Sequence, residues 1–345
     1  MDDSPVLFRR EGALGRITLN RPKALNALTT AMVAAIGRKL GEWKEDDGVR
    51  AILIDAIPGR AFCAGGDIRA ILEAARRKDG SDAEFFRTEY HLNAAIHRSA
   101  KPYVTLIDGY CFGGGLGVSV HGSHRVVTEN TAMAMPETLI GFFPDIGASY
   151  FLNRCPGAIG MYLALTGGRI KGGDLLYSGL ATHGVPAARI GEIVPLLAEG
   201  KLPGEILADL SCGLGSSSLQ EHRAAIDRAF SAPSVEAILD ALAREGEWGA
   251  ATARQLAQLS PFSLKLTHRL MRANAGKDLE TCLTVEYRLS LRMVFARDFA
   301  EGVRAAVIDK DQQPRWEPDA LALIADKDIE SCFAPLTERE LTLPE

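Results

Sequence analysis

The sequence Ala51-Ile-Leu-Ile-Asp-Ala56 is a short apolar run, followed by the glycine-bearing loop Phe62-Cys-Ala-Gly-Gly-Asp67 and the segment Ile68–Arg77. An apolar run of this length predicts a buried strand, and the segment after the loop predicts a helix. The same order recurs downstream, where the apolar run Pro102–Ile107 precedes the glycine triplet Gly113-Gly-Gly115. Strands that alternate with helices in this way are typical of an α/β fold with a largely parallel sheet.

The chain around these segments predicts further strands and helices. Val6–Arg9 and Arg16–Leu19 predict the two strands of a hairpin. Helical spacing of apolar residues predicts helices over Leu28–Lys44 and roughly Ala83–Arg98, and His124–Thr128 predicts another strand.

Strand signals fade after about residue 190. From 219 to 345 the pattern predicts helices separated by Gly and Pro, with long helical stretches at Val235–Leu259 and Leu279–Phe295. We therefore expect a core of residues 1–200 and a helical C-terminal region of residues 201–345.

The composition is that of an ordinary soluble globular protein, because 47% of the 345 residues are hydrophobic and 24% are charged. The net charge of −5 gives no reason to expect nucleic acid or an anionic membrane as a partner. No apolar segment approaches the length of a membrane span, and the N-terminus lacks the features of a signal peptide. The six scattered cysteines predict reduced thiols without a disulfide framework or a zinc site. We therefore expect a soluble cytoplasmic protein.

Two carboxylates, Glu137 and Asp145, lie in the otherwise apolar and glycine-rich run Met135–Gly147. Apolar surroundings disfavour a charged carboxylate and raise its pKa, which suits general acid/base or nucleophilic work. The alternative is a pair of acids on surface turns.

Two glycine loops, Ala64–Asp67 and Gly113–Gly115, each precede a predicted helix. The first N–H groups of a helix lack partners inside it, so two such ends facing one point would bind an anionic oxygen, as an oxyanion hole does. The alternative for both loops is tight backbone packing.

Other catalytic motifs fit the sequence poorly. The triplet lacks the spacing of a dinucleotide fingerprint, and no Gly-Lys-Ser/Thr is present for a phosphate loop. Gly117-Val-Ser-Val-His121 departs from the hydrolase motif G-x-S-x-G, and Ser119 is expected within a short helix instead of a strand-to-helix elbow. His121 and His124 are spaced for a metal, but no third ligand is evident, so no metal is expected.

Several motifs together resemble a known family. Arg60–Arg69, Gly113–Gly115 and Pro136-Glu137 are similar to the crotonase (enoyl-CoA hydratase/isomerase) superfamily, and Asn20–Asn26 matches its N-terminal motif. Within the superfamily, motifs spread over nearly the whole chain most resemble hydrolases of short 3-hydroxyacyl-CoA thioesters: Phe86–Tyr90, Val118–Gly122, Phe143–Gly147, Ala164–Gly168, Gly302–Asp311 and Pro314–Trp316.

The resemblance implies a crotonase-like spiral of ββα units, in which the core binds acyl-CoA and performs catalysis. It also implies that the N–H groups of Gly66 and Gly114 hold the thioester carbonyl oxygen and that Glu137 is catalytic. The implied substrate-binding residues are Glu89, which lines the acyl pocket, and Ala64, Asp67 and Ile68, which lie along the nucleotide end of coenzyme A. Apart from the resemblance, the phosphates of coenzyme A call for Lys or Arg, and the candidates are Lys23, Arg69, Lys265 and Arg269, of which none is singled out.

One departure from the hydratases is informative. They carry a first glutamate where this chain has Gly117, whereas Asp145 replaces a small residue. The addition of water to a double bond needs two carboxylates on one water, so we expect hydrolysis, with Asp145 assisting Glu137 as a nucleophile or as a base that activates water. The leading substrate is 3-hydroxyisobutyryl-CoA, and no cofactor is expected. The alternatives are an enoyl-CoA hydratase/isomerase and a non-catalytic acyl-CoA-binding protein, and a homo-oligomer is possible.

Overall fold

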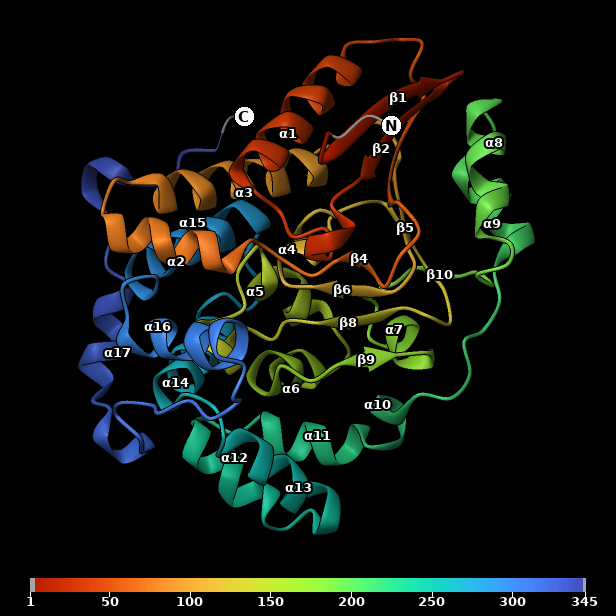
Figure 1. Ribbon diagram of the computed structural model, residues 1–345. Helices are drawn as coiled ribbons and strands as arrows, with labels where there is room; N and C mark the ends of the chain where they lie inside the picture. The colour runs from red at the N-terminus through yellow and green to blue at the C-terminus, as the bar shows by residue number, and fades with distance from the viewer. Residues whose placement is uncertain (1–3, 344–345) are drawn as a thin grey trace. The chain divides into compact units, whose positions relative to one another are not determined.

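The computed structural model describes residues 4–343 (Figure 1). These residues divide into two compact units. Unit 1 comprises the residues up to Asp67, Thr88–Met133 and Arg169–Ser218, and unit 2 comprises Ile68–Arg87, Ala134–Gly168 and the residues from Leu219 onward. These units do not divide at residue 200, because segments far apart in sequence pack together. The expected functional division at that residue stays a prediction.

Unit 1 is built on two sheets. The larger has the strand order β1-β2-β3-β5-β7-β10, and its pairs are parallel except for the antiparallel hairpin β1–β2. Its strands are β1 (Val6–Glu11), β2 (Leu14–Leu19), β3 (Ala51–Ala56), β5 (Tyr103–Ile107), β7 (His124–Val127) and β10 (His183–Gly184). The smaller sheet contains β4 (Ala61–Cys63), β6 (Tyr110–Phe112), β8 (Ala132–Ala134) and β9 (Ile170–Lys171) in that order.

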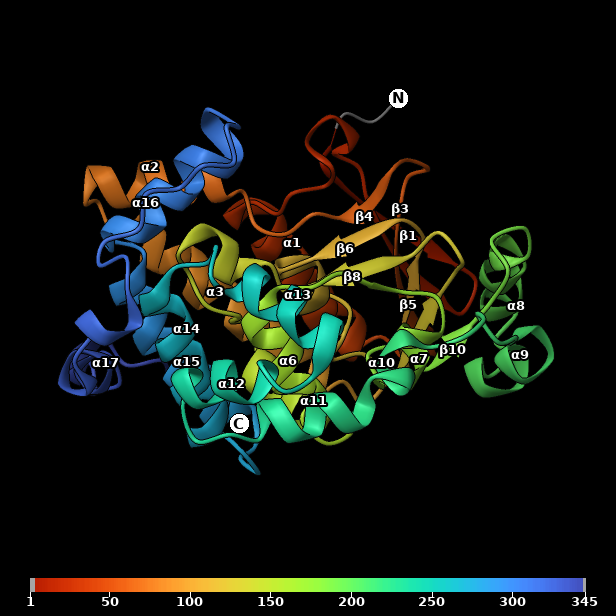
Figure 2. The same cartoon turned by 90° about the horizontal axis from the view of Figure 1, so that it is seen from below.

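The chain alternates between the two sheets. Each of β3, β5 and β7 belongs to the larger sheet, and the strand that follows it, β4, β6 or β8, belongs to the smaller one. Figure 2 shows β4, β6 and β8 side by side. Helix α2 (Ile68–Arg77) follows the consecutive strands β3 and β4, and helix α4 (Gly114–Gly117) follows β5 and β6. The chain therefore repeats a ββα unit, as expected.

The helices are α1 (Thr30–Lys44), α2 (Ile68–Arg77), α3 (Ser81–His97), α4 (Gly114–Gly117), α5 (Ala148–Phe151), α6 (Ile159–Thr166), α7 (Gly173–Tyr177), α8 (Ile193–Ala198), α9 (Pro203–Leu210), α10 (Ser218–Glu221), α11 (Arg223–Phe230), α12 (Val235–Leu242), α13 (Gly246–Leu256), α14 (Pro261–Ala273), α15 (Leu279–Met293), α16 (Arg297–Val303) and α17 (Asp326–Cys332). The prediction of one long helix over Val235–Leu259 is wrong. Helix α12 ends at Leu242, and α13 begins at Gly246, whose φ of +61° is left-handed and interrupts the helical path.

Each unit has its own apolar packing. In unit 1, α8 and α9 cover one face of the larger sheet, where Leu197 and Leu207 pack in the same cluster as Leu53 and Val104. In unit 2 the aromatic rings of Phe86 and Phe142 stack with centroids 5.9 Å apart, and Phe142 also contacts Phe143 and Phe299. Burial of such apolar surface is the main favourable contribution to folding.

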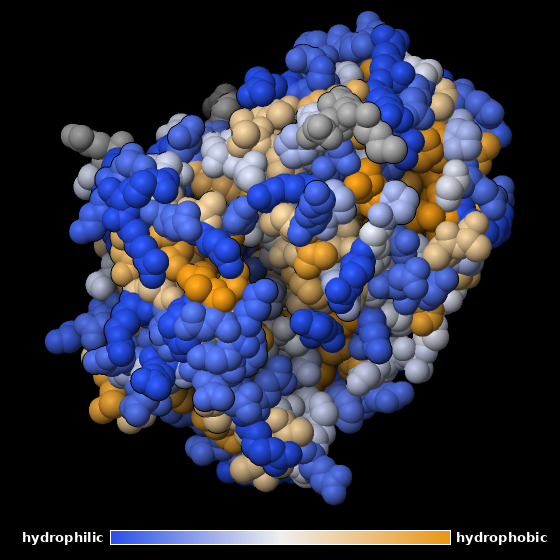
Figure 3. Space-filling model, in the orientation of Figure 1, coloured by the Kyte–Doolittle hydropathy of each residue, from blue (hydrophilic) through white to orange (hydrophobic). Residues whose placement is uncertain are grey.

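Side-chain caps fix where the longer helices begin. Thr29 accepts a hydrogen bond from the amide of Met32 at the start of α1, and Asp278 accepts one from Thr281 at the start of α15. No helix within residues 4–343 is long and apolar enough to cross a membrane. The face seen in Figure 3 is mostly hydrophilic, with apolar patches between hydrophilic residues.

Candidate active site

The loop after β4 is held by the segment that precedes α1. Asn26 is buried, and its Nδ2 donates to the carbonyls of Ala61 at 3.1 Å and Phe62 at 3.0 Å. The amide of Leu28 donates to the carbonyl of Gly65 at 2.8 Å. The Asn20–Asn26 motif therefore supports the glycine loop, a role that the sequence analysis did not assign to Asn26.

The three predicted substrate-binding residues of this loop, Ala64, Asp67 and Ile68, each make different contacts. Asp67 forms an ion pair with Arg21, whose Nη1 lies 2.9 Å from Asp67 Oδ2. The amide of Ala64 donates to the carbonyl of Leu25 at 3.0 Å. Ile68 is the first residue of α2 and belongs to unit 2, whereas Ala64 and Asp67 belong to unit 1. Their role in binding coenzyme A stays a prediction.

The two glycine loops meet within unit 1. An ideal Cβ built on Gly114 would lie 3.2 Å from the amide nitrogen of Gly66 and 2.6 Å from Oε1 of Glu89, so a side chain at position 114 would displace the Glu89 carboxyl and crowd the Gly66 amide. Gly65 has φ +110° and Gly113 has φ +48°, values that favour glycine. The N–H groups of Gly66 and Gly114 donate to no other group among residues 4–343. Two unused amides on neighbouring loops are what the predicted oxyanion hole needs, and the binding of a carbonyl oxygen by Gly66 and Gly114 stays a prediction.

Glu89 brings a buried carboxyl to these loops. It lies on α3 with 2% of its surface exposed, and Oε1 is next to the Cα of Gly114. Burial raises the pKa of the Cys63 thiol to about 12, and the charge of Glu89 contributes to that rise. The carboxyl of Glu89 therefore acts electrostatically on the loop that contains Gly66, beside the candidate oxyanion hole.

Position 117, where hydratases carry their first glutamate, holds a glycine, which contributes only backbone groups. Gly117 ends α4, and its carbonyl accepts a hydrogen bond from Nδ2 of the buried Asn93 at 3.0 Å. Asn93 lies one turn after Glu89 on α3. No acid is thus available at position 117 to help hold a water molecule.

Glu137 and Asp145 both belong to unit 2, and both are buried, with 8% and 6% of their surfaces exposed. Glu137 opens the 3-10 helix η2 (Glu137–Ile140), which ends at Gly141 with φ +69°. An ideal Cβ on Gly141 would lie 2.3 Å from the carbonyl oxygen of Asp298, so only glycine fits this turn. The alternative of two surface turn acids is therefore wrong.

Asp145 lies in a fully buried loop before α5, and a third acid supports that loop. Glu286 of α15 is fully buried, and its Oε2 accepts from the amide of Gly147 at 2.6 Å while its Oε1 accepts from the amide of Ser149 at 2.9 Å. The hydroxyl of Ser149 also donates to Oε1. Glu286 therefore anchors the turn that directly follows Asp145.

The electrostatics of Glu286 connect it to Asp145. Burial raises the pKa of Glu286 to about 8; the hydrogen bonds from Ser149 and Gly147 oppose this rise, and the charge of Asp145 adds to it. The sequence analysis named neither Glu286 nor Ser149 as a site residue. A signal was present, because Glu286 shares helical spacing with the buried residues Cys282 and Leu289 and so places an acid on an apolar face.

The competing catalytic residues have structural roles. The Oγ of Ser119 donates to the carbonyl of Gly115 at 2.8 Å, and Ser119 lies just after α4 instead of within it. His121 is buried with its ring against His97, and Nδ1 of His124 contacts the hydroxyl of Ser123. No group of three metal-binding side chains is found in the described range 4–343.

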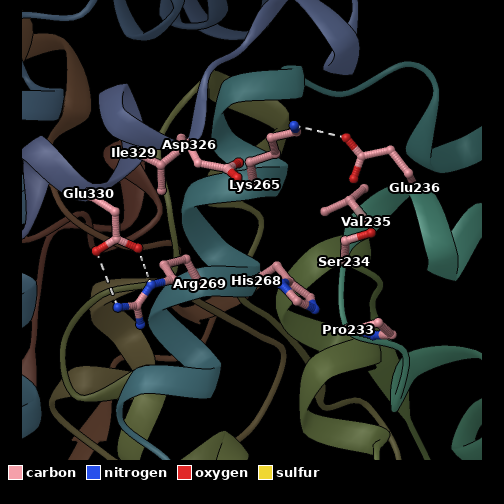
Figure 4. Close-up of a pocket in the computed structure, with 10 residues that line it drawn as sticks. All are labelled: Pro233, Ser234, Val235, Glu236, Lys265, His268, Arg269, Asp326, Ile329 and Glu330. Atoms are coloured by element: carbon pink, nitrogen blue, oxygen red, sulfur yellow. Dashed lines mark hydrogen bonds and ion pairs between the residues drawn. The ribbon is translucent and has the colours of Figure 1, made fainter.

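Two of the four candidate cations, Lys265 and Arg269, line a cavity of about 270 Å³ in unit 2 (Figure 4). Lys265 Nζ lies 2.8 Å from Oε1 of Glu236, and Arg269 pairs with Glu330. Arg69 donates to the carbonyl of Val307. Because acids neutralise Lys265 and Arg269, this cavity offers no excess positive charge for a phosphate.

The family model described as enoyl-CoA hydratase/isomerase matches residues 14–333. The chain belongs to the enoyl-CoA hydratase/isomerase family. A relative from Xenopus tropicalis, named 3-hydroxyisobutyryl-CoA hydrolase, mitochondrial, is 46% identical over 99% of this chain and 91% of its own length. The family expected from the glycine loops and the Pro136-Glu137 dipeptide is thereby confirmed.

Two solved structures of the enoyl-CoA hydratase/isomerase family superpose closely on the chain. One, titled a carnitinyl-CoA dehydratase from Mycobacterium thermoresistibile, has a TM-score of 0.93 and 40% identity, covering 98% of both chains. The other, titled an enoyl-CoA hydratase from Rhodobacter sphaeroides, has a TM-score of 0.92 and 37% identity, covering 99% of this chain and all of its own. The crotonase-like α/β fold is therefore confirmed.

The expectation of a cytoplasmic protein is wrong, because the relative from Xenopus tropicalis is named as a mitochondrial enzyme. Net charge and cysteine spacing report on solubility and on a reducing environment. Both conditions hold in the cytoplasm and in the mitochondrial interior, so these features do not distinguish the two compartments.

Proposed function

We propose that this protein hydrolyses the thioester bond of short 3-hydroxyacyl-CoA substrates, with 3-hydroxyisobutyryl-CoA as the leading one. The observation that carries the proposal is the set of acids: Glu137 and Asp145 are buried, while position 117 holds a glycine. The relative named as a 3-hydroxyisobutyryl-CoA hydrolase, which matches nearly the whole chain, supports the same substrate.

In the proposed reaction the thioester carbonyl oxygen accepts hydrogen bonds from the amides of Gly66 and Gly114. These donors stabilise the negative charge that forms on this oxygen when the carbonyl carbon is attacked. Glu137 acts either as the nucleophile, giving a mixed anhydride that water then cleaves, or as the base that activates water. Asp145 positions Glu137 or the water and assists the departing thiolate. This hydrolysis needs coenzyme A only as part of the substrate.

A second candidate function is the hydration or dehydration of acyl-CoA, because the two solved structures are titled a dehydratase and a hydratase. A panel of acyl-CoA thioesters scored by release of free thiol tests the proposal. We expect the fastest release from 3-hydroxyisobutyryl-CoA. Turnover of enoyl-CoA substrates without thiol release would support the second candidate instead.

Glu89 is proposed to bind the substrate hydroxyl, and this gives a test with matched substrates. A hydrogen bond to a charged group contributes about 1.5–3 kcal/mol. Glu89→Ala is therefore expected to lower kcat/KM for 3-hydroxyisobutyryl-CoA about 10- to 100-fold, with a much smaller loss for isobutyryl-CoA, which lacks the hydroxyl. Equal losses on both thioesters would show that Glu89 supports the neighbouring glycine loops and does not recognise the hydroxyl.

Homo-oligomer formation stays a candidate property of this chain. The mass of the protein in solution at micromolar concentration distinguishes a homo-oligomer from a monomer.

A further inference from the structure

The chain turns sharply after Asp145. Ile146 has φ +56° and Gly147 has φ +80°, so two consecutive residues are left-handed. Ile is β-branched, and such residues rarely adopt this conformation because the Cβ crowds the backbone. The turn therefore needs contacts from elsewhere in the protein to persist.

Glu286 supplies those contacts from a point 139 residues further along the chain. Its two carboxyl oxygens accept hydrogen bonds from the amides of Gly147 and Ser149, which flank the first residue of α5. A second layer holds Ser149, because Nδ2 of Asn274 donates to its hydroxyl at 2.8 Å and Nδ2 of Asn153 donates to its carbonyl at 2.7 Å. All of these residues belong to unit 2.

We propose that Glu286 is a positioning residue, which fixes the direction of the Asp145 carboxyl by holding the turn Ile146–Gly147. The inference rests on the proposed role of Asp145 in hydrolysis. Glu286 is fully buried and its oxygens are occupied by backbone and hydroxyl donors of this turn, so it acts through Asp145 and does not touch the substrate.

A double-mutant cycle between Glu286 and Asp145 tests the proposal. In Glu286→Gln, the amide NH2 replaces one accepting oxygen and faces an N–H donor of the turn, so the turn loses one of its anchors. Misplacement of a catalytic group by about 1 Å lowers turnover up to about 100-fold. We expect E286Q to lower kcat about 10- to 100-fold with little change in KM. In the Asp145→Asn background, where no carboxylate remains to be positioned, we expect the same change to have almost no effect on kcat.

The outcomes separate this inference from the proposed function. If the fold-losses of kcat in E286Q and in D145N multiply in full in the double variant, the inference is overturned. An unchanged kcat in E286Q, together with a lowered kcat in D145N, would also overturn it. Both of these results leave hydrolysis by Glu137 and Asp145 intact. A wild-type kcat in D145N would overturn the role of Asp145 and the inference together.

Two further variants guard against a general loss of structure. Leu283→Ala removes a buried side chain from the same helix and leaves the anchoring groups in place, so we expect a lower melting temperature and a nearly unchanged kcat per folded molecule. Ser149→Ala removes the hydroxyl that donates to Glu286 and accepts from Asn274, while the Ser149 amide keeps its bond to Glu286, and it serves as the test if E286Q does not fold. Its smaller loss of kcat should also vanish in the D145N background, and persistence of the loss there would overturn the inference.

Discussion

Replacing Glu137 by Gln is expected to lower kcat for thioester hydrolysis about 100- to 10,000-fold, the range attributed to a positioned acid or base. An amide neither attacks a carbonyl carbon nor removes a proton from water, so either proposed route stops. Glutamine has nearly the same shape, and KM is expected to change little. The measurement is thiol release at saturating substrate, with the melting temperature recorded in parallel.

A matched control for this variant is Glu42→Gln, which makes the same chemical change at an exposed carboxylate of α1. We expect wild-type turnover from E42Q. An E137Q protein that keeps near wild-type thioesterase activity would remove Glu137 from the reaction. A loss of activity with a matching loss of folded protein would assign Glu137 a structural role.

Gly114→Ala is the second substitution with a large expected effect. The added Cβ would lie 2.6 Å from Oε1 of Glu89 and 3.2 Å from the amide of Gly66, so the Glu89 carboxyl must shift and the Gly66 amide must give way by a few tenths of an ångström. Removal of one oxyanion-hole donor costs about 100- to 1,000-fold in kcat, and we expect a loss of that size. Thiol release under saturating substrate measures it.

The control for Gly114→Ala is the same substitution in α1. An ideal Cβ on Gly37 meets nothing within 4 Å, so G37A should leave kcat unchanged and stabilise the helix by roughly 1 kcal/mol. Near wild-type turnover in G114A would contradict an oxyanion hole at Gly66 and Gly114.

Local patterns in the sequence were sufficient to predict the longer strand and helix on either side of the first glycine loop. The strand Ala51–Ala56 and the helix Ile68–Arg77 occur with the predicted bounds. The three-residue strands β4 and β6 were missed, because a segment of that length contains too few residues to show a period. These short strands form part of the second sheet, and each directly precedes a glycine loop.

Contacts between distant segments explain what the sequence did not reveal about the candidate site. The sequence analysis missed the hydrogen bonds that Glu286 accepts from the amides of Gly147 and Ser149, since nothing local links residues so far apart. Burial of Asp145 was similarly undetermined, because a Pro-Asp pair is also common in surface turns. The roles of Glu137 and Asp145 came from the family resemblance, and the structure added their burial.

The products formed from 3-hydroxyisobutyryl-CoA test the central claim most directly. Separation of the reaction mixture by chromatography distinguishes cleavage of the thioester from loss of water across the neighbouring carbon–carbon bond. Thioester hydrolysis predicts free coenzyme A and 3-hydroxyisobutyrate in equal amounts, with no enoyl-CoA. Formation of the enoyl-CoA without free coenzyme A would contradict the account and identify a dehydratase.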